Sequence, residues 1–195
     1  ERLEAEGAGQ LNDLAVAPDG TIYATDSATG GLRRAAPGDA ALEPWLPDTP
    51  LPGANGIAVS ADGGAVYVAH STGIARIDAA SGELLPRLAN DTRETLAAID
   101  GLYLRGTTLY GIQTVANPVR AIAIDLYETG ARATSVRTLL SHHHPALGEP
   151  TTGTLWNDRF LILANSHVAR LQPDGGVREP ESIRDPVVLS VAASD

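Results

Sequence analysis

The sequence predicts an all-β protein: a β-propeller with four consecutive four-stranded blades. Three observations support this fold class. The 195 residues contain 20 glycines and 13 prolines, which makes the chain rich in turn formers without the regular period of collagen. A pair of short runs with alternating apolar residues around a tight turn recurs four times along the chain. The repeat length is close to that of a propeller blade.

Each repeat begins with a predicted hairpin of two strands. Its turn carries Asp-Gly, Arg-Gly or Asn-Asp, which are residues that favour tight turns. The four hairpins span Leu11–Asp26, Ala54–His70, Ile99–Gln113 and Thr151–Asn165.

A second strand pair is expected after each hairpin, which gives four antiparallel strands per unit. The predicted pairs are Gly31–Arg34 with Leu42–Leu46, Ile74–Asp78 with Glu83–Leu88, Arg120–Asp125 with Ser135–Leu140, and Val168–Leu171 with a strand at Val177. The blades then span roughly residues 9–50, 51–95, 96–147 and 148–195 of a single domain.

One residue at the start of each hairpin serves as an anchor for comparing the repeats. A β-sandwich with regular strand spacing is the alternative fold. The same hairpin recurs in register, which favours the propeller, where blades stack face to face around an axis. The anchors are Asn12, Asn55, Asp100 and Thr152, which are 43, 45 and 52 residues apart.

Charge and composition exclude several functions. The 14 basic residues, all arginine, and the 24 acidic residues give a net charge of −10, which argues against nucleic acid and anionic membranes as partners. No apolar run approaches the roughly 20 residues of a membrane span. Without cysteine, no disulfide, zinc–thiolate site or cysteine nucleophile is possible. Composition does not fix the compartment, which is either cytoplasmic or exported.

The anchor positions predict a site at one mouth of the propeller channel. The first strand of each hairpin is expected to be the innermost of its blade, so the anchors form a ring. Asn12, Asn55 and Asp100 stand where a strand would favour Val, Ile or Thr. Their amide and carboxylate oxygens suit a hard cation such as calcium or magnesium.

A second ring of polar residues is expected at the same mouth, because the second strand of each hairpin returns there. These residues either bind substrate or close turns, since such side chains often satisfy backbone groups in loops. The ring comprises Asp26, His70, Gln113 and Asn165. The histidines at 142–144 are a poor metal site because neighbours on a strand point to opposite faces. No nucleophile-elbow motif is present, which disfavours a triad hydrolase.

These motifs resemble the family that contains gluconolactonases, regucalcin and luciferin-regenerating enzyme, over essentially the whole chain. The resemblance implies six blades and therefore two N-terminal blades before Glu1, in a sequence without methionine. The segments that carry it are Asn12-Asp13 before Pro18-Asp-Gly20, Asn55-Gly56 before Ala61-Asp-Gly63, Ile99-Asp-Gly-Leu-Tyr103, and His144-Pro-Ala-Leu-Gly-Glu-Pro-Thr151 before Ala164-Asn-Ser166, the last as in a bacterial branch.

The resemblance also implies a divalent cation on the axis, held by a Glu, an Asn and an Asp. Calcium is the favoured ion, with zinc or magnesium as alternatives. Asn55 and Asp100 match the metal-binding Asn and Asp, and Asn12 matches an Asn that contacts substrate or water. The Glu has no counterpart, because it would precede Glu1.

Two functions remain open at this point. A metal-dependent, lactonase-like hydrolase of small sugar-acid or related lactones would use Asp100 as metal ligand and general base. A non-catalytic propeller would instead bind a small molecule or a protein partner at the same axial face. The open edges of an incomplete ring would favour oligomers. In the hydrolase, the residues expected to contact substrate are Asn12, His70, Gln113, Thr152 and Asn165.

Overall fold

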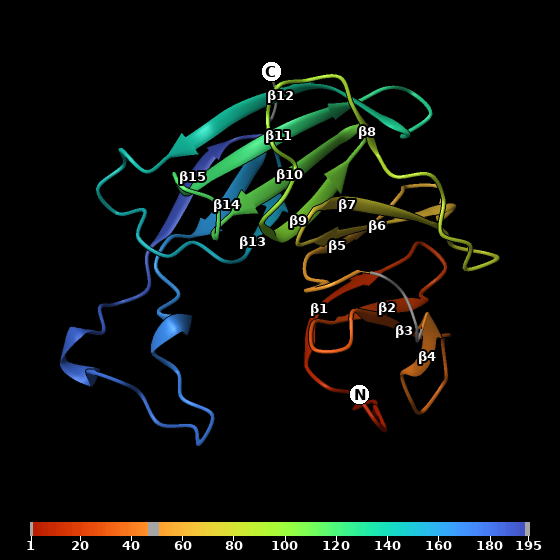
Figure 1. Cartoon of the computed structure of the whole chain (residues 1–195), viewed down its shortest axis with the longest axis horizontal. Helices are drawn as coiled ribbons and strands as arrows, with labels where there is room; N and C mark the ends of the chain where they lie inside the picture. Colours follow the sequence, from red (N-terminus) through yellow and green to blue (C-terminus); the bar gives the residue numbers. More distant parts are fainter. Residues whose placement is uncertain (1, 47–50, 194–195) are drawn as a thin grey trace.

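The computed structural model describes residues 2–46 and 51–193. Within these ranges the protein is all-β, with four sheets, two short 3-10 helices and no α-helix. Figure 1 shows the sheets following one another in chain order along an arc, with the first strand of each on the inner side. None of the described helices is long and apolar enough to cross a membrane.

The first two sheets follow the predicted repeat closely. The first sheet has the four expected strands, but the second has three, because the expected strand at Glu83–Leu88 is reduced to an isolated bridge between Leu84 and Ile77. The strands are β1 (Leu11–Val16), β2 (Ile22–Asp26), β3 (Gly31–Ala35) and β4 (Glu43–Leu46), then β5 (Ile57–Val59), β6 (Ala65–His70) and β7 (Gly73–Asp78).

The third sheet gains a strand from the preceding repeat. The short strand β8 (Ala89–Asn90), which the repeat boundaries place in the second unit, pairs in parallel with the outermost strand of the third. Ala89 N donates to Ala131 O at 3.0 Å, so the linker covers an edge that would otherwise be open. The other strands are β9 (Ile99–Arg105), β10 (Thr108–Gln113), β11 (Arg120–Leu126) and β12 (Arg132–Ser141).

The fourth sheet corrects the sequence prediction. β13 (Gly153–Trp156) and β14 (Arg159–Leu163) form the expected hairpin, but the third strand is β15 (Val188–Ala192) and not Val168–Leu171. The residues of β15 alternate between half-buried and exposed, which places Val191 against the aromatic core of the third and fourth sheets. No residue of 168–170 is buried, so a strand there would gain little from burial.

The segment of residues 166–187, which we call the excursion, leaves the fourth sheet between β14 and β15. It contains the 3-10 helices η1 (Val168–Arg170) and η2 (Pro180–Ser182). Leu171 and Val177 are joined only by an isolated bridge. Figure 1 shows the excursion reaching toward the inner side of the arc.

Neighbouring sheets are joined at their first strands by backbone hydrogen bonds. Gly56 N donates to Asp100 O at 2.7 Å, and Gly101 N donates to Thr151 O at 2.9 Å. A Cβ on Gly56 would lie 2.3 Å from Asp100 O, so only glycine permits this approach. The Asn-Gly and Asp-Gly pairs of the repeat therefore allow one inner strand to contact the next.

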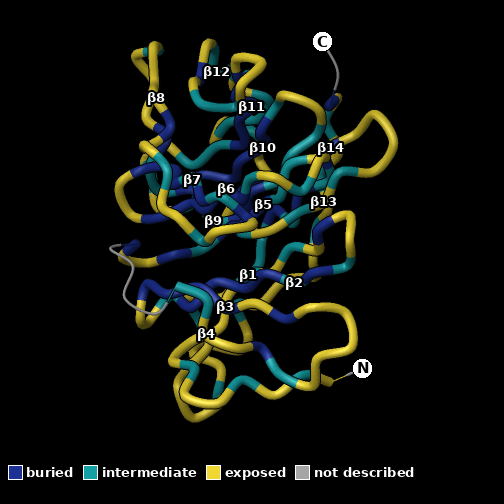
Figure 2. Tube along the Cα trace, turned by 90° about the vertical axis from the view of Figure 1, so that its right-hand side faces the viewer, coloured by how far each residue is buried: buried dark blue, intermediate teal, exposed yellow. Residues whose placement is uncertain are grey.

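The hydrophobic core lies between the sheets. Leu32, Ile57 and Ile77 belong to the cluster between the first and second sheets, and Tyr110 and Phe160 to the cluster between the third and fourth. Figure 2 shows buried residues along the middle strands and exposed ones at the turns. This arrangement buries both faces of the second and third sheets.

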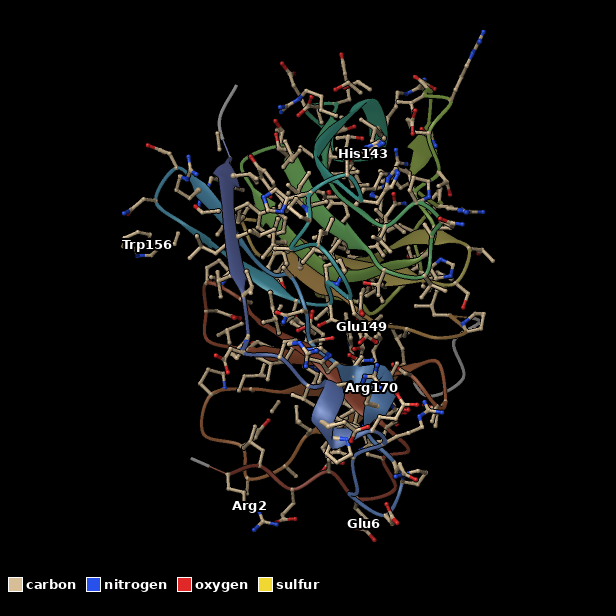
Figure 3. All side chains as sticks on the ribbon, turned by 90° about the vertical axis from the view of Figure 1, so that its left-hand side faces the viewer. Arg2, Glu6, His143, Glu149, Trp156 and Arg170 are labelled. Atoms are coloured by element: carbon tan, nitrogen blue, oxygen red, sulfur yellow. The ribbon has the colours of Figure 1, made fainter. Side chains whose placement is uncertain are left out.

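The outer faces of the first and fourth sheets expose apolar side chains. Leu14 and Val16 of β1 are 61% and 59% exposed, and Trp156 and Val188 of the fourth sheet are 62% and 61% exposed. Figure 3 shows Trp156 pointing away from the molecule. Among the described residues no further sheet packs on either face.

We expect Gly56→Ala to lower the free energy of unfolding by about 1–3 kcal/mol, because the added methyl group must push the second and third sheets apart. Urea unfolding followed by circular dichroism measures this change. Gly148→Ala is the matched control, since its nearest neighbour to an added Cβ is 4.0 Å away. Equal stability of the two variants would contradict the proposed role of Gly56.

We expect the chain to self-associate through its exposed sheet faces, because contiguous apolar surface favours association. Sedimentation velocity over a range of concentrations should show this association weakened in Trp156→Ser. Tyr127→Ser is the control, since Tyr127 is an aromatic residue of similar exposure outside these faces. A chain that stays monomeric at high concentration would contradict the expectation.

Candidate functional site

One pocket lies among the first strands of the sheets, with a volume of about 530 Å³. The structure brings all four anchors together there, from four different sheets. Val168 of the excursion also lines the pocket, which sequence reasoning did not foresee. The polar side chains of the lining are Gln10, Asn12, Asp13, Asn55, Asp100, Thr151 and Thr152.

Asp13 is a functional candidate that sequence reasoning missed. The pairing register of β1 shifts between Leu11 and Leu14, and such a bulge changes the direction in which side chains point. The Asp13 carboxylate accepts a hydrogen bond from Ile57 N at 3.3 Å, which links the first sheet to the second. The signal was present in the sequence, because Asp13 follows directly after the anchor Asn12.

Asn12, the anchor of the first sheet, makes mainly structural contacts. Its Nδ2 donates to Ser27 Oγ at 2.8 Å, and Ser27 Oγ donates to Ala54 O at 2.6 Å. These two hydrogen bonds connect β1 to Ala54, the residue before Asn55. Asn12 also lines the pocket, so it connects the strands and stands within reach of a bound ligand.

Asp100 has the environment expected of a reactive carboxyl group. Burial raises its pKa above the usual value, and the negative charges of Asp13 and Glu149 raise it further. Hydrogen bonds from Asn55 and Thr114 act in the opposite direction without reversing the shift. The ionised form of Asp100 is therefore held by two donors in a site that disfavours its charge.

The carboxyl group of Asp13 also has a raised pKa. Burial raises its pKa, while the backbone N–H groups of Leu14 and Ile57 lower it in part. The pocket thus contains two carboxyl groups that both ionise less readily than in water. Raised carboxyl pKa values in a concave pocket are typical of catalytic and ligand-binding sites.

A tyrosine hydroxyl lies behind the lining residue Thr152. Tyr103 Oη lies 2.9 Å from Thr152 Oγ1, in a hydrogen bond of which either oxygen is the donor, and it accepts from Gly153 N at 2.7 Å. Burial raises the Tyr103 pKa, and the charges of Asp13 and Asp100 add to this effect. The phenol therefore stays protonated at neutral pH and fixes the position of Thr152.

The second ring predicted from the sequence is only partly assembled. His70 lines a smaller neighbouring cavity of about 180 Å³ together with Asn55 and Asp100. Burial and then the charge of Arg87 lower the pKa of His70, so its imidazole is neutral at pH 7. His70 is thus the one predicted member of this ring found beside the anchors within the described residues.

The remaining predicted residues are engaged elsewhere. Gln113 is fully buried and donates to the carbonyl oxygens of Thr95 and Ala97 while accepting from Arg120. Asn165 accepts from Val187 N at 2.7 Å and donates to Asp185 O at 2.9 Å. These bonds assign Gln113 to the core of the third sheet and Asn165 to the base of the excursion.

Asp26, which the sequence places in the same ring, accepts hydrogen bonds from the backbone of two loops. Its two carboxylate oxygens accept from the backbone N–H groups of Gly9, Gln10, Ala28 and Thr29. Burial would raise its pKa, but these hydrogen bonds hold it below the usual value. Asp26 thus closes turns, which is the other role that the sequence left open for this ring.

Glu149 joins the site to the excursion. Its Oε1 accepts from Ala169 N at 3.0 Å, and its backbone pairs with Asn165. Figure 3 shows Glu149 near the middle of the molecule, next to the excursion residue Arg170. Glu149 is therefore a third carboxylate near Asp100, though not one of the residues that line the pocket.

The described residues contain no group of three or more His, Cys, Asp or Glu side chains that could hold a metal ion. The rings of His142 and His143 lie with centroids 3.9 Å apart and tilted by 38°, in a turn after β12 and not in a strand as the sequence suggested. The pocket offers Asp13, Asn55 and Asp100 as oxygen donors, which is the right chemistry for a hard cation but a short ligand set.

Comparison with known proteins gives the fold. No family model and no curated protein matches the chain. A gluconolactonase from Xanthomonas campestris is 20% identical with a TM-score of 0.60, covering 84% of this chain and 58% of that one. A luciferin-regenerating enzyme is 15% identical with a TM-score of 0.59, covering 93% and 61%.

A nidogen–laminin complex also contains a similar structure, with 19% identity, a TM-score of 0.64, and coverage of 79% of this chain and 56% of that one. At these identities the likeness shows the β-propeller fold alone. The chain spans less than two thirds of the length of each of these neighbours.

We predict that Asp100→Asn raises the free energy of unfolding at pH 7 when divalent cations are chelated. The folded-state pKa of Asp100 is raised, so its contribution to stability is present below the usual pKa of 3.8 and is lost as the pH rises through the folded value. The gain in the variant should therefore disappear toward pH 3. Urea unfolding at several pH values measures this.

Asp125→Asn is a control of opposite sign. Burial would raise the pKa of Asp125, but hydrogen bonds from Ser135 and Arg137 hold it below its usual value. Its contribution to stability is thus present above the usual pKa, and the variant should lose stability at pH 7. Loss of stability in Asp100→Asn of the same size at pH 7 would contradict the description of the pocket.

Proposed function

We propose that the chain belongs to a lactonase-like hydrolase that acts on small lactones in the pocket of Asp13, Asn55 and Asp100. The observation that carries the proposal is the pair of partly buried carboxyl groups with raised pKa in one concave site. A general base works best when its pKa lies near the operating pH, and the shift of Asp100 is in that direction. The gluconolactonase among the fold neighbours agrees with this choice.

A divalent cation fits the charge of the pocket. Asp100 and Asn55 would hold it, as the family resemblance implies, and Asp13 would add a second negative charge. When bound, the cation supplies a Lewis acid for the lactone carbonyl. Calcium is the ion that oxygen donors of this kind favour, with magnesium or zinc as alternatives.

The roles of the side chains follow from their contacts. Asp100 accepts the proton of the water that attacks the lactone carbonyl. Asn55 and Thr114 hold the Asp100 carboxylate in place through the hydrogen bonds that also favour its ionised form. Thr152, held by its hydrogen bond with Tyr103, presents a hydroxyl to the substrate, and Asn12 of β1 lines the same pocket.

We expect Asp100→Asn to lower the rate of δ-gluconolactone hydrolysis by about 100-fold or more, since a general base contributes at this scale. A pH-stat assay with calcium, corrected for spontaneous hydrolysis, measures the rate. Asn12→Ala should raise KM more than it lowers kcat, because Asn12 binds substrate without taking a proton.

Gln113→Glu and Asn165→Ala are not suitable controls, because both residues hold the fold together. Asp174→Asn is the better control, since Asp174 lies in an exposed turn of the excursion. Equal rates in Asp100→Asn and wild type would contradict the proposal. Saturable binding of the lactone without turnover would instead favour the non-catalytic propeller.

A further inference from the structure

A second pocket lies at the opposite end of the second and third sheets from Asp100. It has a volume of about 490 Å³ and is lined by three turns: Ser60–Gly64 after β5, Gly106–Thr107 after β9, and Glu128–Gly130 after β11. β5 and β9 both begin beside the Asp100 pocket and end at these turns, so the two pockets lie at opposite ends of the same strands.

Arg76 of β7 contributes the positive charge of this pocket. Its Nε is buried, and it is the only buried side-chain nitrogen or oxygen of the described residues without a hydrogen-bond partner. Leaving a buried charged donor unpaired costs more than most single contacts contribute. The Tyr67 hydroxyl interacts with Arg76, and a carboxylate in the pocket would add a counter-charge beside the guanidinium group.

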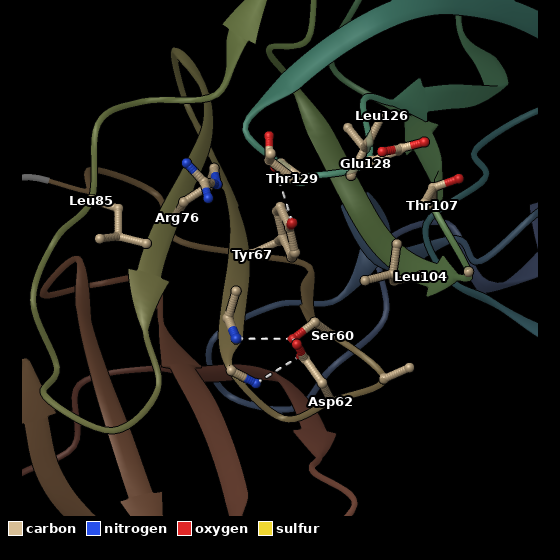
Figure 4. A pocket seen from close by; sticks show the side chains of 15 residues that line it. Ser60, Asp62, Tyr67, Arg76, Leu85, Leu104, Thr107, Leu126, Glu128 and Thr129 are labelled. Atoms are coloured by element: carbon tan, nitrogen blue, oxygen red, sulfur yellow. Dashed lines mark hydrogen bonds between the residues drawn. The ribbon is translucent and has the colours of Figure 1, made fainter.

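The walls beside Arg76 are apolar. Leu85, Leu104 and Leu126 line the pocket, and Tyr67 has its hydroxyl engaged with Gly130 O at 3.0 Å. Figure 4 shows Arg76 and Leu85 on one side, with Leu104 and Leu126 on the other. One guanidinium group in a leucine-lined pocket matches a ligand with one anionic group and a hydrocarbon body.

The acidic residues of the pocket do not compete for Arg76. Asp62 Oδ1 accepts from Ser60 Oγ at 2.6 Å and from Gly64 N at 3.0 Å, so its carboxylate closes the turn. Glu128 is exposed to solvent, where its charge is screened. Figure 4 shows Asp62 at the far end of the pocket from the Arg76 guanidinium.

We propose that this pocket binds a small aliphatic carboxylate, with the carboxylate on Arg76 and the hydrocarbon chain against Leu85, Leu104 and Leu126. The guanidinium group can donate two parallel hydrogen bonds to the two oxygens of a carboxylate. A phenol or an alcohol has only one oxygen and cannot accept both. The site is separate from the Asp100 pocket and is independent of any hydrolase activity there.

Isothermal titration of the whole chain with hexanoate tests the proposal, with hexanol as the probe that lacks the carboxylate. Hexanoate should bind saturably and hexanol at least tenfold more weakly. Arg76→Gln should weaken hexanoate binding at least tenfold, whereas Arg93→Gln, which removes the same charge from an exposed position, should leave it unchanged. Circular dichroism checks that the variants fold.

Amide chemical shifts locate the ligand independently of the variants. Hexanoate should shift the N–H signals of Gly64, Gly106 and Gly130, and leave that of Gly101 in the other pocket unchanged. Equal binding of hexanol and hexanoate, unchanged affinity in a folded Arg76→Gln, or shifts confined to Gly101 would overturn the proposal. If Arg76→Gln does not fold, the two probes and the shifts on the wild-type chain decide the question.

Discussion

The site depends on the hydrogen bonds that join the first strand of one sheet to that of the next. The hydrogen bonds from Gly56 N to Asp100 O and from Gly101 N to Thr151 O join three inner strands, and at Gly56 the approach is closer than any residue with a Cβ would permit. The side chains of Asn55 and Asp100, which precede these glycines, therefore lie in the same pocket. Asn55 and Asp100 meet because their neighbours in the chain are glycines, and the core between the sheets keeps the strands in this register.

Bringing the inner strands together places two carboxyl groups where ionisation is unfavourable. Asp13 and Asp100 lie in partly buried positions, which raises the pKa of both carboxyl groups, and the charge of Asp13 raises the pKa of Asp100 further. The fold tolerates the arrangement because Asn55, Thr114 and the N–H of Ile57 donate to these carboxylates. A polar site of this kind contributes little to stability, and raised carboxyl pKa values in a pocket are typical of functional sites.

The sequence predicted the hairpins and the meeting of the four anchors, because both follow from a strict local repeat. It did not predict β15, because the excursion separates this strand from its partner β14 in the sequence. The apolar residues of Val168–Leu171 indicate a third strand there instead. Asp13 was missed because a bulge in β1 sets the direction of its side chain. An alternating pattern of apolar residues does not reveal such a bulge. Gln113 and Asn165 were polar in the expected places, but only the structure shows that backbone carbonyls and N–H groups satisfy them.

A carboxyl-detected NMR titration of Asp100 tests the central claim most directly, in the wild-type chain and in Asp13→Asn with divalent cations removed. The account predicts that Asp100 titrates above the usual value of 3.8 and that Asp13→Asn lowers its pKa, because one neighbouring negative charge is gone. An Asp100 that titrates at or below the usual value and does not respond to Asp13→Asn would contradict the account.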